Sequence, residues 1–336
     1  MRALLCGSPG ELEIVERPKP AIKAGEARIR LRRAGVRGTD LHIFDGAQPY
    51  FEYPRVIGHE LAGEIDDIGV GGAFEPGQPV AIIPYLSCGT CVACRRGKTN
   101  CCQSLAVLGV HTDGGMADYV CVPESNIVAA DGVSLDQAAM VEFLAIGAHA
   151  VRRGAVKRGN RVLVVGAGPI GIACMIFAGL GGASVTALDT REDRLEFCAR
   201  EIAVDHCVRV NADVKSELAR LTNGEFFDCV FDATGNSKAM NAGFDYVAHG
   251  GAYVLVSIVR DTISFADPEF HKRETTLLSS RNATRQDFDD VFAALRAGLI
   301  PTGALNTHRA SLDEAPGLFP VWIRPEAGVI KAIIEI

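Results

Sequence analysis

The sequence Gly-Ala-Gly-Pro-Ile-Gly over residues 166–171 constrains this 336-residue chain more than any other feature. A continuous apolar run at residues 161–165 precedes it, as is typical of a buried parallel strand, and a helical stretch follows. Asp189 lies 18 residues after Gly171, at the end of the next strand that we expect, over residues 183–188. This order of strand, glycine turn, helix and strand with an acidic end predicts a dinucleotide-binding site in a doubly wound α/β domain.

Each residue of the glycine pattern has a physical role in such a site. Gly166 permits the tight turn, Gly168 lets the backbone approach a pyrophosphate, and Gly171 lets the helix pack closely on the sheet. Pro169 and Ile170 open the helix, whose N-terminus attracts an anion. We therefore expect all five residues to bind the cofactor.

Asp189 also indicates which dinucleotide is bound. Its carboxylate would accept hydrogen bonds from the adenosine ribose and repel a 2′-phosphate, which favours NAD over NADP. Arg191 and Arg194 leave NADP as an alternative, because Arg194 could contact the cofactor; both could equally be solvated helix charges. Thr234 and Gly235 follow another expected strand and would approach the nicotinamide half, or serve only as a turn.

The two parts of the chain differ in how apolar stretches and turn residues are distributed along them. Roughly the first 150 residues contain short apolar stretches cut by turn residues, which predicts a mostly β region. After residue 160, strands alternate with helices, as in a doubly wound sheet. We expect a helix over 288–297 and a final strand, 328–334, that rejoins the first region. The other strands predicted are 26–31, 58–68, 78–83, 227–231, 252–258 and 275–278.

A cysteine cluster points to a bound metal. Cys88, Cys91, Cys94 and Cys102 offer four thiolates within fifteen positions, enough to close a tetrahedral zinc site with a structural role. Cys101 is an alternative fourth ligand, although its neighbour fits the spacing better. An iron–sulfur cluster or free thiols are the other interpretations.

Composition indicates the cellular environment of the protein and argues against some classes of partner. The eleven cysteines are an odd number and argue for a reducing cytoplasm rather than a disulfide framework. A net charge of −7 argues against nucleic-acid and membrane-surface partners. No apolar run reaches the ~20 residues that span a bilayer, so we expect a cytoplasmic protein that acts on a small molecule.

Together these features resemble the zinc-dependent medium-chain alcohol and polyol dehydrogenases. The similarity covers the whole chain and is greatest to the branch of L-galactonate 5-dehydrogenases and of sorbitol and threonine dehydrogenases. The segments that carry it are Gly58-His59-Glu60 with Gly63, Gly38-Thr39-Asp40-Leu41-His42, Val141-Glu142, and residues 267–276 and 280–284. The resemblance implies a GroES-like, mostly β catalytic domain at 1–148 and 285–336, and a Rossmann domain at 149–284. It also implies a homo-oligomer, with a tetramer favoured over a dimer.

The resemblance further implies roles for individual residues. His59, Glu60 and Glu142 would be candidate ligands of a catalytic zinc ion, and Asp40 could orient His59. Thr39 would take the proton of the substrate hydroxyl, and His42 would receive it through a relay. A turn residue and a surface histidine, respectively, are the alternative interpretations of these last two.

The chain departs from the family at Arg37, where the family has a zinc-binding cysteine. A guanidinium has no lone pair and stays charged, so it cannot bind zinc and opposes Zn²⁺ nearby. Arg37 could instead pair with Glu60 or Glu142 and fill the site. Three functions remain: an NAD-dependent polyol or sugar-acid dehydrogenase, which we favour; a zinc-free quinone or enoyl reductase; and a nucleotide-binding relative without catalysis.

Overall fold

The computed structural model describes residues 1–48, 51–69 and 72–336. The chain forms two compact units. Unit 1 comprises Met1–Glu142, Thr284–Gly298 and Thr302–Ile336, and unit 2 comprises Phe143–Ala283 and Leu299–Pro301. The predicted first boundary, after residue 148, falls six residues later than this division, because helix α4 (Val141–Arg153) gives only its first two residues to unit 1.

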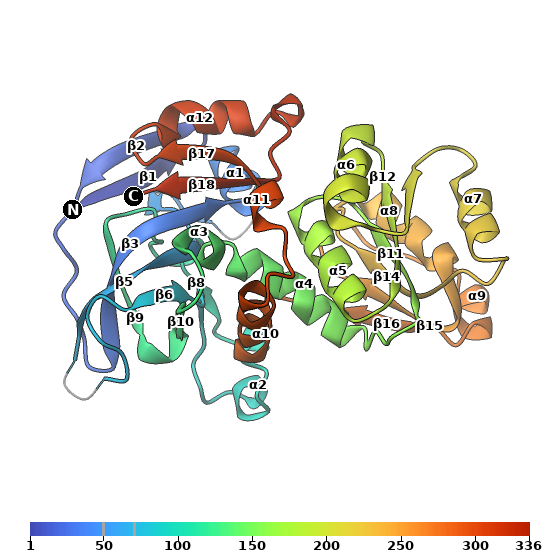
Figure 1. The fold of residues 1–336 in the computed structure, drawn as a ribbon, viewed down its shortest axis with the longest axis horizontal. Helices are drawn as coiled ribbons and strands as arrows, with labels where there is room; N and C mark the ends of the chain where they lie inside the picture. Colours follow the sequence, from blue (N-terminus) through green and yellow to red (C-terminus); the bar gives the residue numbers. More distant parts are fainter. Residues whose placement is uncertain (49–50, 70–71) are drawn as a thin grey trace. The chain divides into compact units, whose positions relative to one another are not determined.

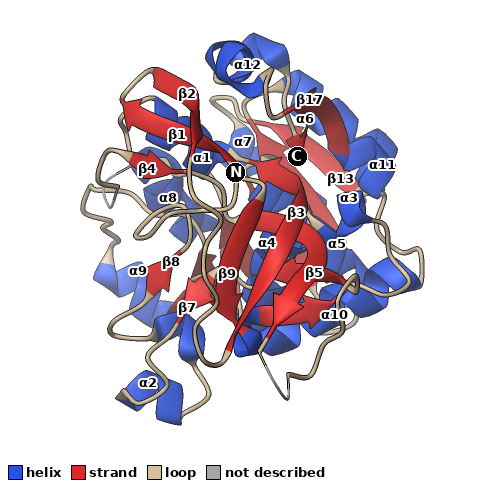
Figure 2. Ribbon diagram, turned by 90° about the vertical axis from the view of Figure 1, so that its left-hand side faces the viewer, coloured by secondary structure: helices blue, strands red, loops and turns tan. Residues whose placement is uncertain are grey.

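A seven-stranded sheet forms the centre of unit 1. Its order is β10 (Ile127–Ala129), β6 (Pro79–Ile82), β5 (Glu60–Ile68), β3 (Glu26–Val36), β18 (Lys331–Glu335) and β17 (Asn306–Ser311), and β9 (Tyr119–Pro123) also pairs with β3. Figure 2 shows β3, β5 and β9 side by side. The final strand β18 pairs antiparallel with β3, so the end of the chain does rejoin the first region, as predicted.

Unit 1 also contains two smaller sheets, six α-helices and three short 3₁₀ helices among the described residues. The sheets are β2 (Glu11–Glu16), β1 (Arg2–Ser8) and β4 (Arg55–Val56), and the pair β7 (Tyr85–Leu86) and β8 (Ala106–Val107). The α-helices are α1 (Gly38–Phe44), α2 (Val92–Arg95), α3 (Leu135–Ala138), α10 (Arg285–Arg296), α11 (Thr302–Leu305) and α12 (Ala315–Trp322). The predicted helix at 288–297 corresponds to α10, which begins three residues earlier at a Thr284 cap.

Unit 2 is a six-stranded parallel sheet with helices on both faces (Figure 1). The strand order is β13 (His206–Arg209), β12 (Ser184–Asp189), β11 (Arg161–Val165), β14 (Phe227–Asp232), β15 (Val247–Leu255) and β16 (Thr276–Ser279). Between the strands run α5 (Pro169–Leu180), α6 (Glu192–Phe197), α7 (Val214–Leu221), α8 (Ser237–Gly243) and α9 (Asp267–Lys272). This is the doubly wound arrangement predicted from the alternation of strands and helices.

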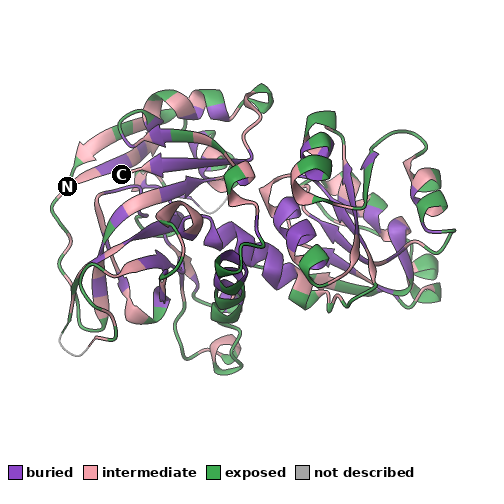
Figure 3. Cartoon of the chain, viewed as in Figure 1, coloured by how far each residue is buried: buried purple, intermediate pink, exposed green. Residues whose placement is uncertain are grey.

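Burial follows the pattern expected for each kind of strand, as Figure 3 shows. In β3, alternate residues such as Ala27, Ile29 and Leu31 face the core, whereas Val162, Leu163 and Val164 of β11 are all buried. No helix in the described part of the chain is both long enough and apolar enough to cross a membrane.

Most predicted strands differ from the observed ones by one to three residues at an end, but two differ by more. The strand predicted over 26–31 continues to Val36 as β3, and β15 differs at both ends. We expected a strand over 252–258, and the structure has β15 over Val247–Leu255. The strand starts earlier because an irregularity in its pairing with β14, near the left-handed Gly250 (φ +75°), absorbs extra residues. It ends earlier because the N–H groups of Val256 and Ser257 both turn to the Asp232 carbonyl.

The packing of α5 on its sheet generates a test. A Cβ at Gly171 would lie 1.7 Å from the carbonyl oxygen of Gly166, which is backbone and cannot move aside as a side chain can. We expect Gly171→Ala to destabilise unit 2 by about 1–3 kcal/mol or more, as overpacking does. Gly179→Ala in the same helix is the control, because a Cβ there has nothing within 4 Å. Urea unfolding measures both, and equal midpoints would contradict the close packing.

Candidate functional site

The glycine loop of unit 2 joins β11 to α5. Gly166 adopts φ +98°, in the left-handed region, and Gly168 caps the helix that begins with Pro169 and Ile170. The first N–H groups of a helix lack partners within it, so they can bind the oxygens of an anion. A Cβ at Gly168 would meet nothing within 4 Å, which leaves open space beside the loop.

Asp189 lies at the end of β12, the strand next to β11, and two backbone groups hold its carboxylate. The N–H of Ala167 donates to Oδ2 at 2.6 Å, and the N–H of Arg191 donates to Oδ1 at 2.9 Å. The Thr190 hydroxyl also donates to Oδ1 at 3.5 Å. The carboxylate is therefore fixed beside the glycine loop, and Oδ2 keeps a lone pair for another donor. Arg194, in α6, is half-buried, and burial lowers the pKa of its guanidinium.

A second loop, with Thr234 and Gly235, follows β14. The Thr234 hydroxyl donates to Asp232 Oδ1 at 2.8 Å, and Gly235 adopts φ +62°. A Cβ at Gly166 would lie 3.0 Å from the Ala233 carbonyl group, so this loop adjoins the glycine loop. Both loops follow the carboxyl ends of β11 and β14, where the strand order reverses direction, and ligands of doubly wound sheets bind at this point.

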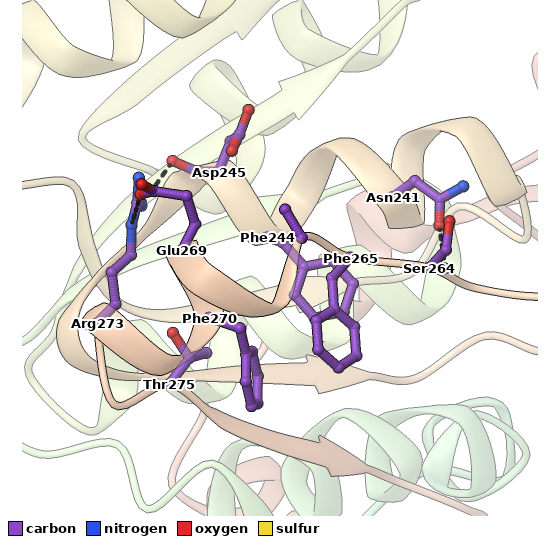
Figure 4. A pocket seen from close by; sticks show the side chains of 10 residues that line it. Asn241, Phe244, Asp245, Ser264, Phe265, Glu269, Phe270, Arg273 and Thr275 are labelled. Atoms are coloured by element: carbon purple, nitrogen blue, oxygen red, sulfur yellow. Dashed lines mark hydrogen bonds and ion pairs between the residues drawn. The ribbon is translucent and has the colours of Figure 1, made fainter.

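Unit 2 also contains a pocket of about 250 Å³ (Figure 4). Phe244, Phe265 and Phe270 line it, and Arg273 lies close to Glu269 at one side. Its other lining residues are Asn241, Asp245, Ser264, Ala266 and Thr275. Asp245 and Thr275 precede β15 and β16, so the pocket lies toward the amino ends of these strands and contains none of the predicted cofactor residues.

The structure brings four predicted cysteines together in unit 1. The Sγ atoms of Cys88, Cys91, Cys94 and Cys102 all lie within 4.8 Å of one another, whereas Cys101 is exposed and outside the group. A zinc ion with sulfurs at about 2.3 Å separates them by about 3.8 Å, so the group fits zinc. Hydrogen bonds with the backbone and side chain of Thr90 lower the pKa of Cys88 to about 6, which favours the thiolate that binds metal.

A cluster of charged side chains lies in the interior of unit 1, where segments distant in sequence converge. All its members are at most 2% exposed except Arg37, which is 14% exposed. The members are Arg37 and Asp40 at the start of α1, His59 and Glu60 at the start of β5, Glu142 in the first turn of α4, and Lys331 at the start of β18. Most of these were predicted from their resemblance to the family's catalytic segments.

Arg37 pairs with both acidic residues that were candidate zinc ligands. Its Nε lies 3.4 Å from Glu60 Oε1, and its Nη1 lies 3.1 Å from Glu142 Oε2. Burial alone would lower the pKa of Arg37, but the Glu142 and Glu60 carboxylates raise it above its ordinary value. The expectation that Arg37 pairs with these groups is met by the geometry.

The second carboxylate oxygen of Glu60 and that of Glu142 each accept a hydrogen bond. Lys331 Nζ donates to Glu60 Oε2, and the Tyr85 hydroxyl donates to Glu142 Oε1. Gly35 makes room for the first contact, since a Cβ there would lie 2.6 Å from Glu60 Oε2 and 2.8 Å from Lys331 Nζ. Burial raises the pKa of Glu60 and lowers that of Lys331, and their mutual attraction opposes both shifts.

His59 faces Asp40 across a short distance. Its Nδ1 lies 3.5 Å from Asp40 Oδ1, and both side chains are fully buried. Against the effect of burial, His59 lowers the pKa of Asp40. Thr39 and His42 lie on α1 beside this pair in sequence, with Thr39 half-buried and His42 exposed.

The cluster does not fit a zinc ion. His59, Glu60 and Glu142 place ligand atoms within 4.8 Å of one another, as a three-ligand site requires. However, Arg37, Lys331 and Tyr85 engage the oxygens of both carboxylates. His59 Nε2 is buried without a hydrogen-bond partner, whereas Glu60 Oε1 and Glu142 Oε2 face Arg37 as ion pairs, although neither accepts a hydrogen bond.

Two members of this network were missed by the sequence reasoning. Lys331 interrupts the apolar run Gly-Val-Ile-Lys-Ala-Ile-Ile, and a charge in a predicted buried strand indicates a buried partner. Tyr85, the first residue of β7, carries no comparable signal. Only the three-dimensional contact with Glu142 identifies it.

Comparisons with known proteins identify the family of both parts of the chain. Residues 23–132 match the family model described as alcohol dehydrogenase GroES-like domain, and residues 169–297 match that described as zinc-binding dehydrogenase. The chain is 44% identical over 310 residues to L-galactonate-5-dehydrogenase of Escherichia coli K12, covering 92% of this chain and 91% of the relative. It is 31% identical over 290 residues, 85% of each chain, to 2-dehydro-3-deoxy-L-galactonate 5-dehydrogenase of Pseudoalteromonas atlantica.

Solved structures show the same fold. The chain superposes with a TM-score of 0.93 and 30% identity on an alcohol dehydrogenase of Escherichia coli CFT073 crystallised with NADH, covering 100% of this chain and 99% of the other. The predicted combination of a GroES-like domain with a Rossmann domain is confirmed. The chain belongs to the zinc-binding, medium-chain alcohol dehydrogenase family.

Proposed function

We propose that this protein is an NAD-dependent dehydrogenase that oxidises a secondary alcohol of a sugar acid or a polyol to a ketone. In this reaction the carbinol carbon gives a hydride to C4 of the nicotinamide, and the hydroxyl group loses a proton. The observation that carries the proposal is the Asp189 carboxylate, held beside the glycine loop in a chain 44% identical to an enzyme named for L-galactonate. The second relative is also named for a sugar acid.

The proposed cofactor contacts follow from the two loops of unit 2. The N-terminus of α5 would bind the pyrophosphate, next to Gly166, Gly168 and Pro169. Asp189 would accept the ribose hydroxyls, and the loop of Thr234 and Gly235 would approach the nicotinamide half. A carboxylate fixed by two backbone hydrogen bonds cannot turn away from a 2′-phosphate, which supports NAD over NADP.

The proton route would use α1. Thr39 and His42 are three residues apart on this helix, so they lie on the same face. Thr39, half-buried, would take the hydroxyl proton, and the exposed His42 would pass it to solvent, since imidazoles exchange protons with water near neutral pH. Arg37 would supply a permanent positive charge near the substrate oxygen.

The four clustered cysteines would hold a structural zinc ion. Four thiolates leave no coordination position for a substrate, so the metal would tie the segment from Cys88 to Cys102 together without taking part in hydride transfer. In this role zinc binding is coupled to local folding.

Reduction of NAD tests the proposed activity. The purified protein should reduce NAD with at least one sugar acid or polyol. Thr39→Val, which removes the hydroxyl but keeps the shape, should lower kcat by about 10²-fold or more, as loss of acid–base catalysis does. Thr39→Ser keeps the hydroxyl and should retain most of the activity. NADH fluorescence should show unchanged cofactor binding in both variants. A wild-type protein that binds NADH but oxidises none of these alcohols would support the non-catalytic alternative.

The cofactor preference rests on the charge of Asp189. Asp189→Asn removes the repulsion of the 2′-phosphate, so we expect the ratio of the NAD and NADP affinities to fall by about tenfold or more, because two charges ~4 Å apart near a protein surface repel by up to ~4 kcal/mol. Titration calorimetry with each cofactor measures the ratio. Glu196→Gln, an exposed residue of α6, is the control and should leave it unchanged. Equal affinities in the wild type would overturn the preference.

Cysteine substitutions test the structural zinc. Cys94→Ser removes one of four ligands and should lower the zinc content by about one ion per chain and reduce thermal stability. Cys101→Ser is the matched control, because that neighbouring thiol is exposed and outside the group. Elemental analysis and thermal unfolding provide the readouts. Full zinc content in Cys94→Ser, or an equal loss in the control, would show that other ligands hold the metal.

A further inference from the structure

We propose that the buried cluster of unit 1 works without a metal ion and that the Arg37 guanidinium takes the metal's place between Glu60 and Glu142. The inference deepens the proposed dehydrogenase function, because it concerns the charge that acts on the substrate oxygen. It makes the cysteine group the one zinc site that we assign within the described chain.

All four carboxylate oxygens of Glu60 and Glu142 already face a cation or a hydroxyl group. Glu60 uses Oε1 for Arg37 and Oε2 for Lys331. Glu142 uses Oε2 for Arg37 and Oε1 for the hydroxyl of Tyr85. A metal ion entering here would have to displace at least one cation from a carboxylate that is at most 2% exposed. The displaced cation would then be left buried without its partner, which is costly.

The acidic and basic side chains of the buried cluster balance one another. Arg37 and Lys331 neutralise Glu60 and Glu142 one to one, and Asp40 faces His59. A divalent cation added to this set would introduce two further positive charges where water is largely excluded. Replacing a thiolate that binds Zn²⁺ by a guanidinium, by contrast, keeps the local charge the same. A thiolate and a zinc ion sum to one positive charge, and so does arginine.

The side chains of the cluster differ in their exposure to solvent. The Arg37 side chain is 14% exposed, whereas those of His59, Glu60 and Lys331 are fully buried. Arg37 is therefore the cationic side chain of the cluster that keeps exposed surface, although its Nε atom is buried. It would offer its charge to the substrate oxygen while the hydroxyl proton leaves through Thr39 and the hydride goes to NAD. Arginine keeps this charge at every working pH.

Metal content measured on the complete chain tests the proposal. Wild-type protein, dialysed after exposure to excess zinc, should hold about one zinc ion per chain, and Arg37→Cys should hold about two. Arg30→Cys is the matched control, because it places a thiol at an exposed position on β3, the strand that precedes Arg37, away from Glu60 and Glu142, and should hold about one. Cobalt(II) reconstitution of Arg37→Cys should add a thiolate-to-cobalt absorption band, and His59→Gln in that background should remove it.

A second variant keeps the test decisive if Arg37→Cys does not fold. Cys94→Ser, with Arg37 intact, should retain no zinc after the same dialysis. One retained ion, or two ions in the wild type, would overturn the proposal because the metal would then coexist with the guanidinium. An unchanged count of about one in folded Arg37→Cys would also overturn it. These counts need neither substrate nor NAD, so they can fail independently of the proposed activity.

Discussion

Two buried carboxylates, Glu60 and Glu142, impose the strictest requirement on unit 1. Neither can remain charged in the interior without a cation and hydrogen-bond donors, and Arg37, Lys331 and Tyr85 supply them. These residues come from the starts of α1, β5, α4 and β18, and from β7. The final strand must therefore add to β3 in the observed register, because this pairing brings Lys331 to Glu60. Sheet order and charge neutralisation depend on each other here.

The two units form their candidate binding sites from different parts of the polypeptide. In unit 2 the candidate site is formed mainly by the backbone. It consists of a left-handed glycine turn, a helix N-terminus and an acidic side chain held by two N–H groups. In unit 1 side chains from separate segments meet, and their charges decide what can bind. A substitution in the first kind of site acts mainly through shape, as at Gly171. A substitution in the second acts mainly through charge, as at Arg37.

This difference explains how much the sequence could predict. The glycine loop, the strand before it and Asp189 lie close together in the sequence, so they could be predicted from it. The periodicity of hydrophobic residues predicted most of the neighbouring strands and helices. The cysteine group was equally visible, because its spacing is short. Lys331 and Tyr85 were missed because their importance arises from contacts with residues 271 and 57 positions away. Similarly, the early start of β15 depends on a bulge against β14, which hydrophobic periodicity does not encode.

The order of segments along the chain has a consequence for synthesis. Residues 143–283 of unit 2 lie between the parts of unit 1 that carry Glu60 and Lys331. The ribosome must therefore complete most of unit 2 before β18 exists, and domains generally fold as units while they are made. Until then Glu60 lacks its lysine and the edge of β3 that later pairs with β18 is open. The sheet of unit 1 therefore stays incomplete until synthesis reaches the last residues of the chain.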